Sequence, residues 1–159
     1  MSIERVRAYL AQFGAEGRIR EFDQSSATVE LAARAVGTEP ARIAKTLSFM
    51  VGDTPTLVVL AGDARVNNAA FKATFHTKAK MLSADQAAEL VGHAVGGVCP
   101  FGVNDGVEVW LDESLRRFET VWPAAGSSNS AIELTLDELE RFSRARGWVD
   151  VGRGWCAEE

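Results

Sequence analysis

Cysteine and histidine are scarce in this chain, which holds two of each among its 159 residues. Two cysteines, Cys99 and Cys156, cannot form the several cross-links of a small disulfide-rich fold. We therefore expect a reducing, cytoplasmic setting. A zinc site needs three or four ligands at close spacing, and His93 and Cys99 have no second pair near them in the sequence. The sequence predicts no metal site, and we expect no cofactor.

Long apolar runs are also missing. No stretch approaches the roughly 20 apolar residues that a membrane-spanning helix needs. The first residues, MSIERVRAYLAQF, lack the uninterrupted apolar centre of a signal peptide. We expect no membrane partner.

Positive charge is in the minority, since 17 basic residues face 22 acidic ones and the formal net charge is −5. Proteins that bind long duplexes through a broad basic face have the opposite balance, which excludes that class. Residues 64–80 (ARVNNAAFKATFHTKAK) are an exception, because they contain Arg65, Lys72, Lys78 and Lys80 and no acidic residue. This segment can contact a few phosphates at one end of a nucleic acid.

Apolar runs of strand length alternate with stretches of helical periodicity, and no internal repeat or long linker separates them. At this length we expect a single domain over residues 1–159. Residues 45–51 (KTLSFMV) and 56–62 (TLVVLAG) enclose the turn signal GDTP, which predicts a β-hairpin. The glycine fingerprint of a dinucleotide-binding fold is absent. The pattern predicts a mixed α/β fold with a mixed sheet that curls towards a barrel.

Helix boundaries are marked by caps. Residues 28–37 (TVELAARAVG) end in glycine, which favours a helix that stops at Gly37. Residues 83–92 and 135–147 each begin with a capping box, in which the first side chain and the one three residues later bond each other's backbone. We expect these helices to end at Gly92 and Gly147.

The most chemically loaded stretch is the glycine loop, residues 92–102 (GHAVGGVCPFG). One interpretation is a Cys99 nucleophile activated by His93. A second is a cradle of backbone amides for an anion, because glycines let amides converge on a ligand. A third is a tight turn in which Cys99 packs as a small apolar side chain. No lysine follows the glycines, so the loop is not a nucleotide-binding P-loop.

Three segments together resemble the YbaK/EbsC family, the aminoacyl-tRNA synthetase-associated or prolyl-tRNA synthetase editing-like domains. They are VGTEPARIAKTLSFMV, the glycine loop about fifty residues later, and AAGSSNSAIELTLDELERF near the C-terminus. The resemblance covers about residues 20–151. It implies a curved, barrel-like sheet and a freestanding trans-editing hydrolase, which cleaves the ester between a wrong amino acid and a tRNA, often tRNA(Pro). The implied partner is the acceptor end of a mischarged tRNA, with prolyl-tRNA synthetase or an elongation factor as candidate protein partners.

The resemblance also implies the site residues. Lys45 matches the family lysine at the start of a strand, and Gly96, Gly97 and Pro100 match a loop whose amides face the aminoacyl carbonyl. Asn129, with Ser128 beside it, falls in a segment that lines the family site. Candidate walls of the amino-acid pocket, by proximity to the matched segments, are Phe22, Val29, Leu47 and Phe49.

One difference from the family pattern bears on which deacylase activity is expected. Where some relatives carry an aspartate shortly after the asparagine, this chain has Ala131 and Ile132. That difference disfavours a cysteinyl-tRNA deacylase of the YbaK type. The alternative to an enzyme is a non-catalytic module of the same fold that binds tRNA ends or a synthetase.

Overall fold

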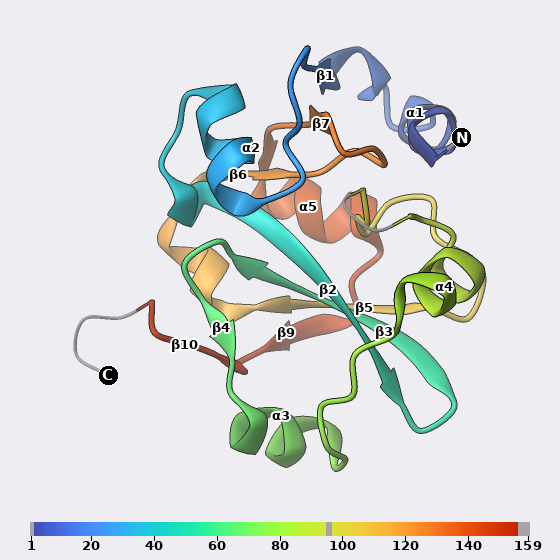
Figure 1. The fold of residues 1–159 in the computed structure, drawn as a ribbon, viewed down its shortest axis with the longest axis vertical. Coiled ribbons are helices and arrows are strands. Elements are labelled where there is room, and N and C mark those ends of the chain that lie inside the picture. Colours follow the sequence, from blue (N-terminus) through green and yellow to red (C-terminus); the bar gives the residue numbers. More distant parts are fainter. Residues whose placement is uncertain (1, 95–96, 156–159) are drawn as a thin grey trace.

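A six-stranded mixed sheet forms the centre of the computed structural model, which describes residues 2–94 and 97–155 (Figure 1). Its strand order is β8-β6-β2-β3-β5-β9. The strands are β2 (Ile43–Val51), β3 (Thr54–Ala61), β5 (Glu108–Asp112), β6 (Thr120–Pro123), β8 (Leu134–Thr135) and β9 (Gly147–Val149). Two short pairs lie outside this sheet, β1 (Arg20–Glu21) with β7 (Ser130–Ala131) and β4 (Arg65–Val66) with β10 (Gly152–Arg153).

The predicted hairpin is the longest pairing in the sheet. β2 and β3 run antiparallel from the pair Ala44 and Ala61 to the pair Val51 and Thr54. Gly52 occupies the turn with φ +60°, a conformation that glycine adopts without strain. β6 joins β2 and β5 joins β3 in parallel, and β9 then pairs in parallel with β5. The expected mixed α/β fold with a curved sheet is therefore confirmed.

Helices cover the sheet on both faces. The α-helices are α1 (Ser2–Ala11), α2 (Val29–Val36), α3 (Asn68–Phe75), α4 (Ala84–Gln86) and α5 (Leu136–Ser143), and a π-helical turn (Ala87–Val91) continues α4. Gly37 and Gly92 end their helices in the left-handed conformation, and both capping boxes form, as predicted. The expected end at Gly147 is wrong. α5 stops at Ser143 because Arg144 takes the left-handed conformation with φ +54°, and Gly147 begins β9.

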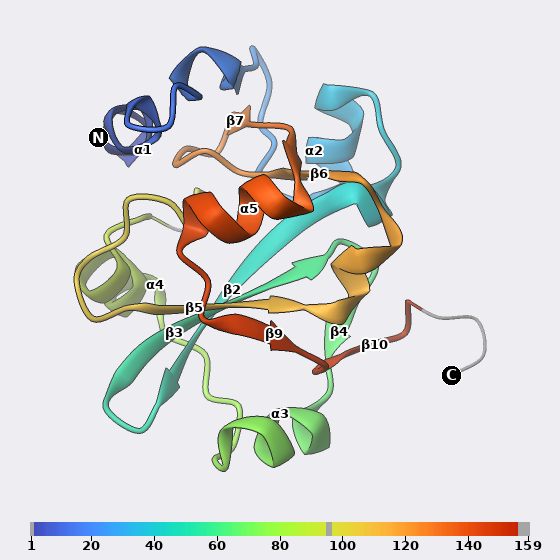
Figure 2. The same cartoon turned by 180° about the vertical axis from the view of Figure 1, so that it is seen from behind.

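Strand alternation divides the buried side chains into two cores. Leu57 and Val59 of β3 face the larger core, where α1 and α5 pack (Figure 2). Val58 and Leu60 face the smaller core, which lies against Phe71 of α3. The central hairpin is thus covered on both faces, and β3 is buried from position 56 to position 61.

One edge of β2 is only partly paired. β6 pairs with β2 at Ile43 and Ala44 alone. Further along, the segment of residues 80–82 covers the same edge, since the Met50 amide donates to the Lys80 carbonyl and the Leu82 amide donates to the Ser48 carbonyl. Between these contacts, no described segment pairs with β2 at residues 45–47. This opening positions the site described below.

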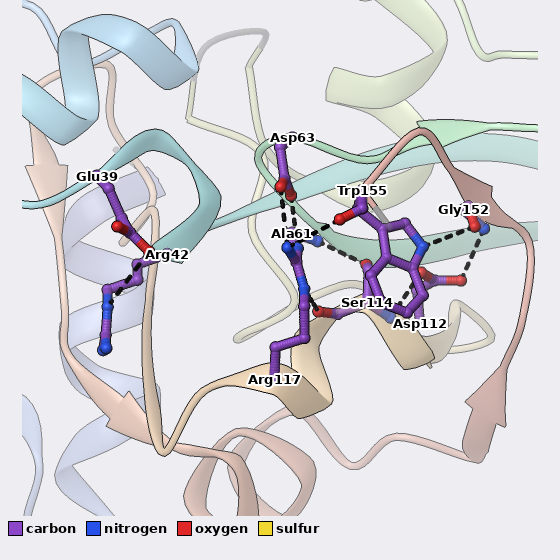
Figure 3. A network of polar contacts seen from close by, with 9 residues as sticks. All are labelled: Glu39, Arg42, Ala61, Asp63, Asp112, Ser114, Arg117, Gly152 and Trp155. Atoms are coloured by element: carbon purple, nitrogen blue, oxygen red, sulfur yellow. Dashed lines mark hydrogen bonds and ion pairs between the residues drawn. The ribbon is translucent and has the colours of Figure 1, made fainter. Parts of the chain in front are cut away.

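A buried carboxylate ties the C-terminal segment to the sheet (Figure 3). Asp112 is fully buried at the end of β5. One carboxylate oxygen accepts the amides of Val151 and Gly152 at 2.8 and 3.0 Å, and the other accepts the Ser114 amide at 3.0 Å. Gly152 then pairs with β4. Asp112 therefore holds the strand that carries Arg65.

A buried histidine closes the glycine loop. His93 is fully buried, and its Nε2 lies 2.8 Å from the Phe101 carbonyl oxygen, so the ring donates from Nε2. No described residue bonds Nδ1. Burial lowers the pKa of His93 below its ordinary 6.5, a shift that the bond to Phe101 opposes and the charge of Arg5 assists. The loop thus depends on a neutral imidazole.

Asp112→Ala is expected to destabilise the fold by roughly 3–5 kcal/mol, because three buried amides lose their acceptor. Asp112→Asn keeps one acceptor oxygen and turns an NH2 group towards an amide, so about half of that loss is expected. The free energy of unfolding in urea measures both. Asp150→Ala is the control, since that carboxylate is exposed and pairs only with Arg153. Equal stabilities for the Asp112 and Asp150 variants would contradict this role.

His93→Gln is expected to remove part of the acid sensitivity of the fold. The pKa of His93 in the folded protein lies below its ordinary 6.5. As the pH falls below 6.5, the unfolded chain therefore gains a proton on His93 before the folded protein does, and the free energy of unfolding decreases. A glutamine can donate to Phe101 without titrating. Between about pH 7 and pH 5, the wild type should therefore lose more unfolding free energy than the glutamine variant. Parallel pH profiles would refute the assignment.

Candidate functional site

A cavity of about 400 Å³ opens beside the unpaired stretch of β2. Such a volume suits a small organic ligand. In Figure 1, α2 lies near the start of β2 and α4 lies nearer its later half, and residues from both regions line the cavity. Its lining is mostly apolar with several hydroxyl groups: Ser26, Ala27, Thr28, Val29, Ala32, Ile43, Ala44, Lys45, Thr46, Leu47, Ser48, Met81, Leu82, Ala87, Val98, Trp122, Ala124, Ser130 and Ala131.

Among the described residues that line the cavity, Lys45 is the one with a cationic side chain. It lies at the point where β6 stops pairing with β2, and it is half-buried. Burial lowers the pKa of Lys45, and the positive charge of Arg65 lowers it further, while Asp63 and Glu30 act in the opposite direction. Asp63 is itself engaged by Arg117, with N–O distances of 2.6 and 2.9 Å (Figure 3). Lys45 therefore has no strong carboxylate partner in the described structure and is available to a ligand.

Thr46 brings unpaired polar groups to the same wall. Because Ser48 and Met50 bond along the outer edge of β2, alternation directs the backbone N–H and C=O of Thr46 to that edge as well. No described strand pairs with it there. Its hydroxyl oxygen is buried and also has no hydrogen-bond partner among the described residues. Buried polar groups are rarely left unpaired, so this wall is suited to a polar ligand.

The glycine loop reaches the cavity through Val98. Gly97 packs so closely that an added Cβ would lie 2.8 Å from backbone atoms of Gly126 and Ser127, which explains why this position is glycine. The Gly97 amide donates to the Ala94 carbonyl at 3.0 Å. The Val98 amide has no acceptor in the described part of the chain. Gly96, the other predicted loop glycine, lies outside the described residues.

Three of the predicted site residues line the cavity, namely Lys45, Leu47 and Val29. Two expected walls lie elsewhere. Phe49 is 2% exposed and packs in the smaller core, with its ring centroid 4.7 Å from that of Phe71. Phe22 borders a separate shallow hollow between β1 and the end of α2. The prediction used closeness in sequence, which does not reveal where the cavity ends along a strand.

The remaining predicted residues, Pro100, Asn129 and Ser128, lie next to the cavity but do not line it. Pro100 is buried and borders a second, smaller cavity on the far side of the loop. The Asn129 side chain donates to the Phe22 carbonyl at 2.9 Å and accepts from the Ser127 hydroxyl at 2.9 Å. The Ser128 carbonyl accepts the Ser26 amide at 2.6 Å. Asn129 and Ser128 thus fasten the segment before α2 to the β7 region and do not line the cavity.

Sequence reasoning missed several lining residues, including Ser26, Ser130, Trp122 and Met81. Ser130 directly follows the predicted Asn129, and it lines the cavity together with Ala131, the other residue of β7. Trp122 lies opposite Ile43 in a parallel pairing that only the tertiary structure reveals. No signal in the sequence marks Met81, which is 58% exposed at the rim.

The structure removes the cysteine-nucleophile interpretation. Cys99 is fully buried, and burial raises the pKa of its thiol to about 12, so the reactive thiolate is not formed near neutral pH. Within residues 2–94 and 97–155, three or more potential metal ligands do not gather anywhere. The same ranges contain no helix with the length and apolar character to span a membrane.

Comparison with known proteins gives the context of this cavity. The chain is 51% identical over 156 residues to uncharacterized protein YwhH of Bacillus subtilis (strain 168), covering 98% of this chain and 99% of that protein. It is 23% identical over 111 residues to proline–tRNA ligase of Lactiplantibacillus plantarum (strain ATCC BAA-793 / NCIMB 8826 / WCFS1), covering 69% of this chain and 19% of that enzyme.

Solved structures share the fold. A "putative trans-editing enzyme for prolyl tRNA synthetase" superposes with a TM-score of 0.87 at 29% identity, covering 96% of this chain and 98% of that one. Hypothetical protein APE2540 superposes with a TM-score of 0.76 at 25% identity, covering 90% and 99%. The family described as "Aminoacyl-tRNA editing domain" matches residues 23–142, which contain every element that lines the cavity. The chain belongs to the aminoacyl-tRNA editing domain family.

Proposed function

We propose that this protein is a trans-editing deacylase, which hydrolyses the ester between a small non-cognate amino acid and the 3′ end of a tRNA. The names of the relatives make tRNA(Pro) the first candidate. The observation that carries the proposal is that Lys45 of β2 and Val98 of the glycine loop, 53 positions apart, line one cavity in a chain of the editing family.

The reaction needs little from reactive side chains. An aminoacyl ester is already activated, and a water oxygen can add to its carbonyl carbon. The bond from that carbon to the ribose oxygen then breaks, and the ribose oxygen takes the proton that the water gives up. The products are the free amino acid and a tRNA with a free terminal hydroxyl group. The terminal ribose hydroxyl can assist this proton transfer.

Stabilisation of the oxyanion is assigned to the glycine loop. A tetrahedral oxyanion forms when water adds, and fixed backbone amides stabilise such a charge by about 3–4 kcal/mol for each good donor. Because the Gly97 amide is bonded within the loop, the unpaired Val98 amide is the better candidate donor among the described residues. Gly97 acts through its close contact with Gly126 and Ser127, which sets the position of the loop.

Lys45 and Thr46 are assigned to substrate orientation. The Lys45 ammonium group can hold the terminal phosphate or the ester, and the unpaired groups of Thr46 can bond the amino group of the substrate. Size selection follows from apolar walls such as Val29 and Leu47. One methylene in such a pocket discriminates by about 1–3 kcal/mol, which is the scale at which synthetases err and editing is needed.

Lys45→Met should lower the deacylation rate by about 100-fold or more, because it keeps the alkyl chain and removes the charge from the cavity. The measurement is single-turnover hydrolysis of tRNA(Pro) charged with alanine, serine, threonine, cysteine, 2-aminobutyrate or proline. Arg141→Ala on α5 is the control, since this exposed cation lies outside the cavity. Full activity of Lys45→Met would overturn the assigned role. Tight tRNA binding without hydrolysis of any charged tRNA would favour the non-catalytic module.

Gly97→Ala should slow hydrolysis by about 10-fold or more, because the new methyl group forces the loop away from Gly126 and Ser127. Gly17→Ala is the matched control, since an added Cβ there meets no atom within 4 Å. Thermal unfolding of both variants separates loss of the site from loss of the fold. Equal rates for the two variants would refute the role of this contact.

A further inference from the structure

The lysines of this chain are confined to one stretch of the sequence. All four lie between positions 45 and 80, and the three beyond Lys45 belong to a segment that has no acidic residue from position 64 to position 84. We call Arg65, Lys72, Lys78 and Lys80 the basic rim. In a chain of net charge −5, four cations without an intervening acid form a strong local exception.

The basic rim is free of internal charge partners. All four residues are exposed. The ion pairs in the described part of the chain use Arg7, Arg18, Arg42, Arg116, Arg117, Arg146 and Arg153, and none uses a rim residue. Between Lys78 and Lys80, Ala79 packs inward on the smaller core. Lys78 and Lys80 are therefore both exposed to solvent on either side of a residue that packs on the core.

The basic rim is continuous with the cavity. Lys80 bonds β2 through its carbonyl, and Met81, the next residue, lines the cavity mouth. At the other end, Arg65 follows the turn that leaves β3, in which the Ala64 amide donates to the Ala61 carbonyl, and Ala61 pairs with Ala44 beside Lys45. Figure 1 shows the chain passing from β4 through α3 and back towards α4, along the side of the sheet below β2.

We propose that the basic rim binds the phosphates of the RNA stem whose 3′ end enters the cavity. This inference rests on the proposed function, because the cavity supplies the anchor for the RNA end. Phosphates are the group that unpaired lysines and arginines on an acidic protein would select. An anionic membrane fits less well, because the only large apolar side chains exposed in the described structure are Leu31 and Met81, and membrane-surface binding also needs an apolar face.

The rim also explains how an acidic protein can accept tRNA. Repulsion from the acidic surface disfavours RNA elsewhere, whereas the rim attracts it beside the cavity mouth. The contacts are to phosphates, so they orient the stem without reading its sequence. Selection of one tRNA over another would then depend on the RNA end that enters the cavity or on a partner protein.

The test compares two triple variants that each remove three positive charges. The first is Lys72→Ala/Lys78→Ala/Lys80→Ala, which leaves Arg65 and its effect on Lys45 in place. The control is Arg116→Ala/Arg141→Ala/Arg146→Ala, three exposed cations away from the cavity. Binding of an uncharged tRNA(Pro) transcript is measured by fluorescence anisotropy over a series of salt concentrations, and thermal unfolding verifies that both variants fold.

The rim variant should bind the transcript about 10- to 100-fold more weakly at moderate salt. The slope of log affinity against log salt should fall by about 2–3, since each lost phosphate contact lowers it by roughly 0.7–0.9. The control should match the wild type. Unchanged affinity and slope for the rim variant, equal losses in both variants, or equal binding to anionic phospholipid vesicles would overturn the proposal.

Turnover separates this inference from the proposed function. With charged tRNA, the rim variant should raise KM by a similar factor while kcat changes little, and the effect should shrink for aminoacylated adenosine, which has no stem. If the wild type and the rim variant hydrolyse charged tRNA equally efficiently, the proposed role of the basic rim is wrong, while the proposed deacylase function is retained. If the wild type binds tRNA through the basic rim but hydrolyses no charged tRNA, the deacylase function is wrong and the proposed role of the rim is supported.

Discussion

The incomplete pairing of β2 is the constraint on which the site depends. Along one edge this strand bonds β3 over its length, whereas along the other it is paired at Ala44 and again at Ser48, with a gap between them. A sheet edge inside a protein normally finds a partner, because buried backbone groups are costly to leave unbonded. Here the gap faces a cavity of about 400 Å³ and places Lys45 and Thr46 in its wall. The ligand can supply the missing bonds.

The remaining elements hold the borders of this gap. Asn129 and the Ser128 carbonyl bind the segment before α2 to the β7 region, and the closely packed Gly97 sets the position of the glycine loop against residues 126–127. Asp112 fixes the C-terminal segment that pairs with β4 and therefore places Arg65. None of these residues needs reactive chemistry. The site that we propose for ester hydrolysis relies on backbone amides and one ammonium group, so it requires none of the two cysteines and two histidines of the chain.

Local features were predictable where a single interaction decides them. The capping boxes at Ser83 and Thr135, and the left-handed glycine at Gly37, depend on atoms a few residues apart, and all three formed as expected. The end of α5 was not predictable in the same way. Arg144 adopts a positive φ that its residue type does not favour, so the helix stops before the glycine that appeared to end it. Tertiary packing overrides the weaker local preference.

By itself, the sequence determined the mixed α/β class, the central hairpin, the helix caps and the two segments that carry Lys45 and the glycine loop, because periodicity and caps act over short distances. Only the tertiary structure decided which neighbours of those segments reach the cavity. Phe49 and Leu47 are two positions apart on one strand and both pack on the smaller core, yet Leu47 also lines the cavity and Phe49 does not. That division depends on where β6 and residues 80–82 stop covering β2, and the parallel β2–β6 pairing joins residues nearly eighty positions apart.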